Sequence, residues 1–167
     1  MPIGVLILCT GNSARSVMVE AILNRRGKGR FRAYSAGSKP VGVVNPIGVK
    51  LLKFKGYDTS GFRSKSWDEF SGAGAPDVQI VITVCSNAAG ETCPIWPGAP
   101  VQVHWGFPDP AAMTGSEENK LAAFSEIYDA IDAYITDLLA LPVEAKSAPD
   151  LKAALQNIAI QHAGELL

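Results

Sequence analysis

A cysteine and an arginine near the start of the chain frame a loop of small residues, in the segment Cys9-Thr10-Gly11-Asn12-Ser13-Ala14-Arg15-Ser16. The apolar run at 3–8 predicts a buried strand of a parallel sheet, and the residues after Ser16 predict a helix. Backbone N–H groups at such a turn, the helix dipole and the guanidinium of Arg15 would bind a tetrahedral oxyanion. The same field favours the thiolate of Cys9, so we expect a nucleophile beneath the bound anion.

A structural interpretation of this segment is also open. Cys9 would then be a small buried residue at the end of a strand, Arg15 would face solvent, and Asn12 and Ser13 would cap the helix. The functional interpretation is favoured, because the spacing falls between a strand and a helix, where its mechanism requires it. We therefore expect the oxyanion to be bound by Thr10, Gly11, Asn12, Ser13, Ala14, Arg15 and Ser16.

Two further cysteines, Cys85 and Cys93, lie in one loop rich in small residues after the predicted strand at 78–84. In a structural interpretation Cys85 ends the strand and Cys93 has no role. In a relay, Cys85 would attack an oxidised Cys9, and Cys93 would resolve that bond by thiol exchange. The spacing alone does not establish a disulfide between them. A zinc site is disfavoured, because the chain has only 2 histidines and no second cysteine pair.

Asp109 stands between two prolines, in a loop that leaves the same edge of the predicted sheet as the cysteines. The prolines stiffen its backbone. A carboxyl group held near the anion would donate a proton to a leaving oxygen, while the alternative is a turn aspartate that caps its own backbone. His104 is expected at a strand end and His162 on the surface of the last helix, without catalytic roles.

Composition restricts the class of protein. A chain of 167 residues with 47% hydrophobic content can bury one substantial core. Its net charge of -1 argues against a nucleic-acid or membrane-surface protein, and the opening apolar run is too short to span a bilayer. Three cysteines do not make a disulfide framework, so we expect a cytoplasmic protein with catalytic or redox-active thiols.

Alternating strands and helices predict an α/β fold, a single three-layer α/β/α domain around a four-stranded parallel sheet. The domain would span residues 1–141, and a C-terminal helical extension would span residues 142–167. Strands are expected at 3–8, 31–36, 78–84 and 101–104, a helical turn at 64–70, and helices at 16–26, 46–55, 117–139 and 149–166.

With these motifs assembled, the chain resembles the arsenate reductases of the superfamily shared with low-molecular-weight protein tyrosine phosphatases. The resemblance covers about residues 3–140. It is carried by the segment at 9–16, Tyr-Ser-Ala-Gly at 34–37, Ser-Lys-Ser-Trp-Asp-Glu-Phe at 64–70, the cysteines at 85 and 93, and His-Trp-Gly-Phe-Pro-Asp-Pro at 104–110. The anion loop and Asp-Pro are shared with the phosphatases, whereas the cysteine pair and His-Trp-Gly belong to the reductases.

The resemblance implies a mechanism of the thioredoxin-coupled type. Cys9 would attack arsenate while Arg15 and the loop amides hold it, and Asp109 would protonate the departing oxygen. Cys85 would then attack Cys9 and expel arsenite, and a Cys85–Cys93 disulfide would remain for thioredoxin or another thiol reductant. Phosphate would be a competing anion. We also expect no cofactor, no resident metal and a monomer.

The resemblance also suggests roles around the loop. Ser16 matches a hydroxyl that supports the thiolate, and Asn12 matches a residue that shapes the loop. In some relatives Asn12, Glu20 and Ser35 help to build a cation site, but here alignment puts Lys65 near that place, so its ammonium group would replace the metal.

Two other classes of function stay open from the sequence. A phosphatase acting on phosphotyrosine or a small phosphate ester would need only Cys9, Arg15 and Asp109. A binding module, an anion or thiol sensor docking a partner through its last helix, would not need Cys9 as a nucleophile at all.

Overall fold

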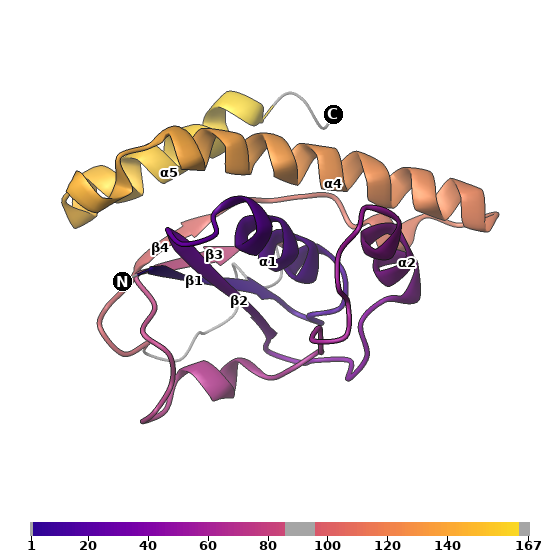
Figure 1. Ribbon diagram of the computed structural model, residues 1–167, viewed down its shortest axis with the longest axis horizontal. Coiled ribbons are helices and arrows are strands. Elements are labelled where there is room, and N and C mark those ends of the chain that lie inside the picture. The colour runs from indigo at the N-terminus through magenta and orange to yellow at the C-terminus, as the bar shows by residue number, and fades with distance from the viewer. Residues whose placement is uncertain (1, 86–95, 164–167) are drawn as a thin grey trace.

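The computed structural model describes residues 2–85 and 96–163 and has a four-stranded parallel sheet at its centre (Figure 1). The strands pair in the order β2-β1-β3-β4, with bounds β1 Ile3–Cys9, β2 Phe31–Gly37, β3 Ile80–Thr83 and β4 Val101–His104. Cys9 pairs with Gly37, and Thr83 lies between Leu8 and His104. All four strands therefore end at one edge, the carboxyl edge, as predicted.

Four α-helices of the described residues contribute to the core on one face of the sheet, with bounds α1 Arg15–Arg26, α2 Pro46–Phe54, α4 Glu117–Ala140 and α5 Ala148–His162. Short 3-10 turns connect them: η1 Trp67–Phe70, η2 Pro110–Ala112 and η3 Val143–Ala145. Figure 1 shows α4 and α5 running along one side of the sheet, with η1 on the opposite side. The predicted α/β fold is thus confirmed.

The alternation of β1 explains how the layers form. Val5, Ile7 and Cys9 join the large core beneath α1, α4 and α5, whereas Leu6 and Leu8 face a smaller core with Phe70 and Trp96 on the other side. Both sets are buried, which is why β1 reads as a continuous apolar run in the sequence. The sheet consequently carries Cys9 on its helix-covered face.

Several element boundaries follow from local chemistry. Asn45 caps α2 by accepting the Ile47 and Gly48 N–H groups, and Pro46 supplies the first helical residue. The third strand is shorter than predicted, Ile80–Thr83 rather than 78–84. The last helix ends at His162 with Ala163 as its C-cap, and residues 164–166 of its predicted range lie outside the described residues.

The helical extension after residue 141 packs on the domain. Helix α5 contacts β4 and α4, and it buries Leu151, Leu155 and Ile158. Those side chains belong to the same core as the sheet. The boundary between residues 141 and 142 stays a prediction.

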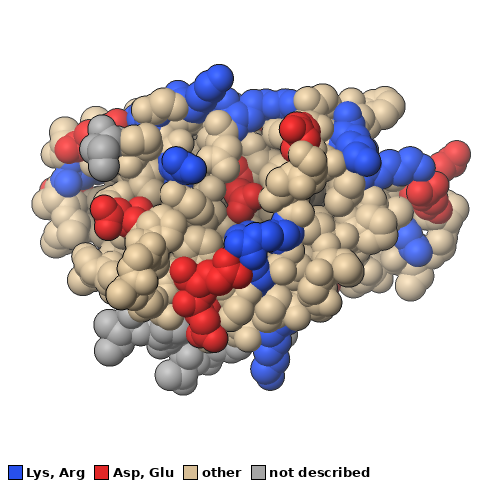
Figure 2. Space-filling model, turned by 60° about the horizontal axis from the view of Figure 1, so that its bottom comes forward, with Lys and Arg blue, Asp and Glu red and all other residues tan. Residues whose placement is uncertain are grey.

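The surface carries mixed charge. On the face seen in Figure 2, lysine and arginine side chains are interspersed with aspartate and glutamate, in keeping with the net charge of -1. In the described part of the chain no helix combines the length and the apolar character needed to cross a bilayer.

Candidate active site

The loop between β1 and α1, residues 10–14, is here called the anion loop. Its carbonyl oxygens are engaged by the neighbouring segment: Thr10, Gly11 and Ser13 accept the N–H groups of Lys39, Val41 and Asn45 at 3.0, 3.1 and 2.8 Å. Carbonyl oxygens repel an anion, so tying them to residues 39–45 suits a loop whose amides bind one. Cys9, at the end of β1, is only 6% exposed.

The Tyr-Ser-Ala-Gly motif at 34–37 ends in glycine because the backbone of Gly37 passes close to the anion loop. A Cβ atom at this position would lie 2.4 Å from the Thr10 carbonyl oxygen and 2.9 Å from that of Cys9. Only glycine lets β2 run this close to the base of the anion loop.

Asn12 holds the anion loop from within. Its backbone is in the left-handed region, with φ at 47°, and its side chain is fully buried. The amide nitrogen donates to Ser16 Oγ at 2.8 Å and to Ser35 Oγ at 3.0 Å, and Oδ1 accepts the Lys65 N–H at 2.9 Å. One residue thus ties the loop to α1, β2 and the segment before η1.

A largely buried ion pair lies behind Asn12, with side chains 10% and 13% exposed. Ser35 Oγ donates to Glu20 Oε1 at 3.0 Å, and Lys65 Nζ lies 3.7 Å from the same oxygen. Burial raises the pKa of Glu20, although Lys65 and Ser35 act to lower it. Burial likewise lowers the pKa of Lys65, although Glu20 acts to raise it. The ammonium group of Lys65 therefore faces the carboxylate as a bound cation would.

Replacing Lys65 with methionine is expected to make stability more sensitive to pH. A carboxyl group whose pKa is raised on folding loses stability as the pH rises through that pKa, and removing Lys65 raises the pKa of Glu20 further. We expect a loss of about 2 kcal/mol in the free energy of unfolding at pH 8 and little loss near pH 4. Urea titrations at several pH values measure this.

Two controls accompany the Lys65 experiment. The double variant Lys65→Met/Glu20→Gln should recover the stability at pH 8, and Lys50→Met, which breaks an exposed pair with Glu117, should change little. An equal loss for Lys65→Met at all pH values would show that charge compensation is not its role.

Cys85 lies against the anion loop. Its sulfur accepts the Thr10 N–H at 3.4 Å and lies 3.7 Å from Thr10 Oγ1. A hydrogen bond to the Cys85 sulfur and burial raise the pKa of Cys9, and they outweigh the lowering by Arg15 and by the Gly11 N–H. Burial and the neighbouring Cys85 sulfur, which the anion loop taken alone does not include, therefore act against the thiolate expected at Cys9, which stays a prediction.

Replacing Cys85 with alanine should consequently lower the pKa of Cys9. The substitution removes both the sulfur hydrogen bond and the Coulomb repulsion from Cys85, and leaves Arg15 in place. We expect alkylation of Cys9 by iodoacetamide at pH 7 to accelerate by about tenfold, since the thiolate is the reacting form. Peptide mass spectrometry over a pH series measures the pH at which the alkylation rate of Cys9 is half its maximum. A half-maximal pH equal to or above that of the unsubstituted chain would contradict this.

Arg15 and Asp109 meet at the mouth of the loop. Arg15 donates from Nη1 to the Phe107 carbonyl oxygen at 3.0 Å, and Nη2 lies 4.0 Å from Asp109 Oδ2. Asp109 also caps its own turn by accepting the Ala111 N–H at 3.0 Å, as the alternative interpretation expects, and its role as a proton donor stays a prediction. The Asp109 side chain is 46% exposed, so its carboxyl group is open to solvent.

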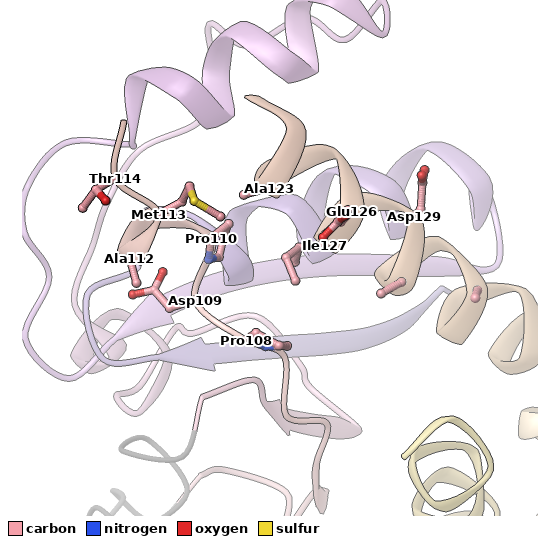
Figure 3. A pocket seen from close by; sticks show the side chains of 12 residues that line it. Pro108, Asp109, Pro110, Ala112, Met113, Thr114, Ala123, Glu126, Ile127 and Asp129 are labelled. Carbon is pink, nitrogen blue, oxygen red and sulfur yellow. The ribbon is translucent and has the colours of Figure 1, made fainter. Parts of the chain in front are cut away.

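A cavity of about 870 Å³ opens beside Asp109. Figure 3 shows Asp109, Pro110 and Met113 on one wall and Ile127 of α4 on the other. This cavity gives solvent and small solutes a way to the acid.

The predicted site residues are largely brought together. Cys9, the anion loop, Arg15, Cys85 and Asp109 gather at the carboxyl edge, whereas Cys93 lies outside the described residues. Among the histidines, His104 does end a strand, with Nδ1 2.8 Å from Thr83 Oγ1.

The prediction that His162 lies on the surface is wrong. Its side chain is 13% exposed and its Nε2 lies 2.6 Å from Asp137 Oδ2. Its ring stacks on Tyr134, with centroids 4.6 Å apart. Sequence reasoning also missed the bond from the Lys65 backbone to Asn12, because no periodic pattern signals a contact between such distant segments.

A cysteine beneath an amide-lined loop, with an arginine and an aspartic acid at its mouth, defines a class of α/β proteins that handle tetrahedral oxyanions through a sulfur nucleophile. Comparisons with known proteins agree. Residues 4–150 match the low molecular weight phosphotyrosine protein phosphatase family. The arsenate reductase of Halalkalibacterium halodurans is 39% identical over 127 residues, which are 76% of this chain and 88% of that protein.

Other arsenate reductases and phosphatases are also similar to this chain in sequence or in fold. The arsenate reductase of Bacillus subtilis is 38% identical over 76% of this chain and 88% of its own. The Escherichia coli K30 tyrosine phosphatase Wzb shares the fold, with a TM-score of 0.62 at 21% identity over 83% of this chain and 99% of that chain. The thioredoxin-dependent arsenate reductase of Corynebacterium glutamicum also shares the fold. Its TM-score is 0.58 at 24% identity, over 83% of this chain and 61% of that chain. The chain belongs to the low molecular weight phosphotyrosine protein phosphatase family, and within it is related to the arsenate reductases.

Proposed function

We propose that this chain reduces arsenate to arsenite through a cysteine relay. The observation that supports this best is the place of Cys85, whose sulfur accepts the Thr10 N–H and lies close enough to Cys9 to raise the pKa of that thiol. Hydrolysis of a phosphate ester uses one nucleophilic sulfur and has no use for a second beside it. A thiol relay requires such a neighbour, and the similarity to arsenate reductases points the same way.

In the proposed reaction, Cys9 Sγ bonds to arsenic, and an arsenate oxygen leaves as water after taking a proton from Asp109. The Arg15 guanidinium and the anion-loop amides hold the remaining oxygens. Cys85 Sγ then attacks Cys9 Sγ, and the sulfur–arsenic bond breaks with its electron pair staying on arsenic. Arsenic is thereby reduced from the +5 to the +3 state, and a Cys9–Cys85 disulfide forms.

Regeneration needs two electrons from outside. Cys93 would attack Cys85 and release the Cys9 thiolate, which leaves a Cys85–Cys93 disulfide. A dithiol reductant of the thioredoxin type would reduce that disulfide, which places the reaction in a reducing compartment such as the cytoplasm. The chain would act as a monomer.

The direct test is arsenite release from purified protein with arsenate, NADPH, thioredoxin and thioredoxin reductase. Steady turnover that stops when thioredoxin is left out is the expected result. Replacing thioredoxin with glutaredoxin and glutathione identifies the reductant. No arsenite with either system, from a protein that binds phosphate, would refute the proposal.

Phosphate ester hydrolysis is the second candidate, supported by the geometry of Cys9, Arg15 and Asp109 alone. The double variant Cys85→Ser/Cys93→Ser separates the two functions. If this variant keeps robust phosphatase turnover and the unsubstituted chain reduces no arsenate, the phosphatase is the function.

A further inference from the structure

The loop that carries the acid is attached to the C-terminal helix. Trp105, 1% exposed, donates its indole N–H to the backbone carbonyl oxygen of Leu155 in α5 at 3.0 Å. The Trp105 and Phe107 amides donate to Thr83 and Val84, so this part of the loop also continues the pairing with β3. Trp105 therefore joins the sheet to α5 four residues before Asp109.

An aromatic cluster makes a second connection. The ring of Tyr134 in α4 packs edge-on against Trp105 and Phe107, with centroids 5.3 and 4.7 Å apart. The ring of His162 from α5 stacks on the ring of Tyr134, with centroids 4.6 Å apart. The Asp137 carboxylate contacts Nε2 of that histidine. The last turn of α5 thus holds Tyr134 in the position that supports Phe107.

Phe107 connects the aromatic cluster to Arg15 and Asp109. Its carbonyl oxygen accepts Arg15 Nη1, and Asp109 follows two residues later with Oδ2 4.0 Å from Arg15 Nη2. A shift of Phe107 would therefore move the oxyanion-binding guanidinium and the acid together. Displacements of about 1 Å at a reacting centre can cost about 100-fold in rate.

This support comes from outside the family core. The family match ends at residue 150, whereas Leu155 and His162 lie beyond it. A helix that served only to cover the edge strand β4 would need its apolar face, not a hydrogen bond and an aromatic stack directed at the loop of Asp109.

We propose that α5 is a positioning element of the active site, with Trp105 and His162 as positioning residues that fix Asp109 and Arg15 through Phe107. Neither residue contacts the substrate in this account. The inference rests on the proposed function only in that arsenate turnover is one of its readouts.

The test compares Trp105→Phe, which keeps a ring but removes the N–H donor, with Leu52→Ala, which opens a cavity at a buried side chain of α2. For Trp105→Phe we expect kcat for arsenate to fall about tenfold, with KM changed less than twofold. Hydrogen exchange of the Phe107 amide should accelerate about tenfold. Leu52→Ala, at a temperature where it is folded, should keep kcat and that exchange rate within twofold of the unsubstituted chain.

His162 gives a second, matched pair. His162→Ala removes the stack on Tyr134 and should lower kcat about threefold to fivefold, whereas His162→Phe keeps an aromatic ring there and should retain most of it. Gln156→Ala, on the exposed face of α5, should match the unsubstituted chain.

Unchanged kcat and Phe107 exchange in Trp105→Phe would overturn the proposal, as would equal losses in Leu52→Ala. The exchange measurement needs no substrate. An unsubstituted chain that releases no arsenite would therefore refute the proposed function, while the exchange result would still decide the role of α5.

Discussion

Arsenate reduction is expected to fall by at least about 1,000-fold when Cys85 is replaced with serine, because a hydroxyl cannot form the bond to Cys9 whose formation leaves two electrons on arsenic. Serine keeps an acceptor for the Thr10 N–H that Cys85 now receives at 3.4 Å, so the anion loop should retain its shape. Coupled NADPH oxidation and direct assay of arsenite measure the loss.

Phosphate ester hydrolysis provides the control for this substitution. It requires Cys9 but not Cys85, so Cys85→Ser should keep any such activity, whereas Cys9→Ser should abolish both reactions. Undiminished arsenate turnover by Cys85→Ser would remove the relay from the mechanism.

Replacing Arg15 with lysine is the second large effect. The guanidinium donates to the Phe107 carbonyl oxygen and lies 4.0 Å from Asp109, so it is held in place, and in the proposed reaction its remaining N–H groups would bind the oxyanion. An ammonium group is a point charge on a flexible chain and cannot reproduce this planar arrangement of donors. We expect kcat/KM for arsenate to fall by about 100-fold to 1,000-fold, as for loss of an oxyanion donor.

The same helix offers a matched control. Arg26, in the last turn of α1, pairs with Asp132 at the surface, and Arg26→Lys should change kcat/KM less than twofold. The inhibition constant of phosphate should rise with Arg15→Lys and stay the same with Arg26→Lys. Equal effects of the two substitutions would mean that Arg15 is not an oxyanion ligand.

The fold was predictable because its signals are local. The apolar run at 3–8, the small residues after Cys9 and the proline pair around Asp109 each describe one strand, loop or turn, and parallel pairing brings them to one edge. The gathering of Cys9, Arg15, Cys85 and Asp109 follows from that topology alone.

What escaped prediction depends on contacts between distant segments. The indole of Trp105 reaches a carbonyl oxygen 50 residues away, and the ring of His162 finds Tyr134 on another helix. The contact of the Cys85 sulfur with the Thr10 N–H escaped prediction for the same reason, since the approach of a strand end to a neighbouring loop is set by packing and not by either motif. Local patterns specify elements, but they do not specify which side chains meet between them.

One measurement tests the relay most directly: mass spectrometry of the Cys93→Ser variant after mixing with excess arsenate in the absence of any reductant. The account predicts one arsenite released per chain and a disulfide between Cys9 and Cys85, with no further turnover. Arsenite released without that disulfide, or no arsenite from a chain that binds arsenate, would contradict it.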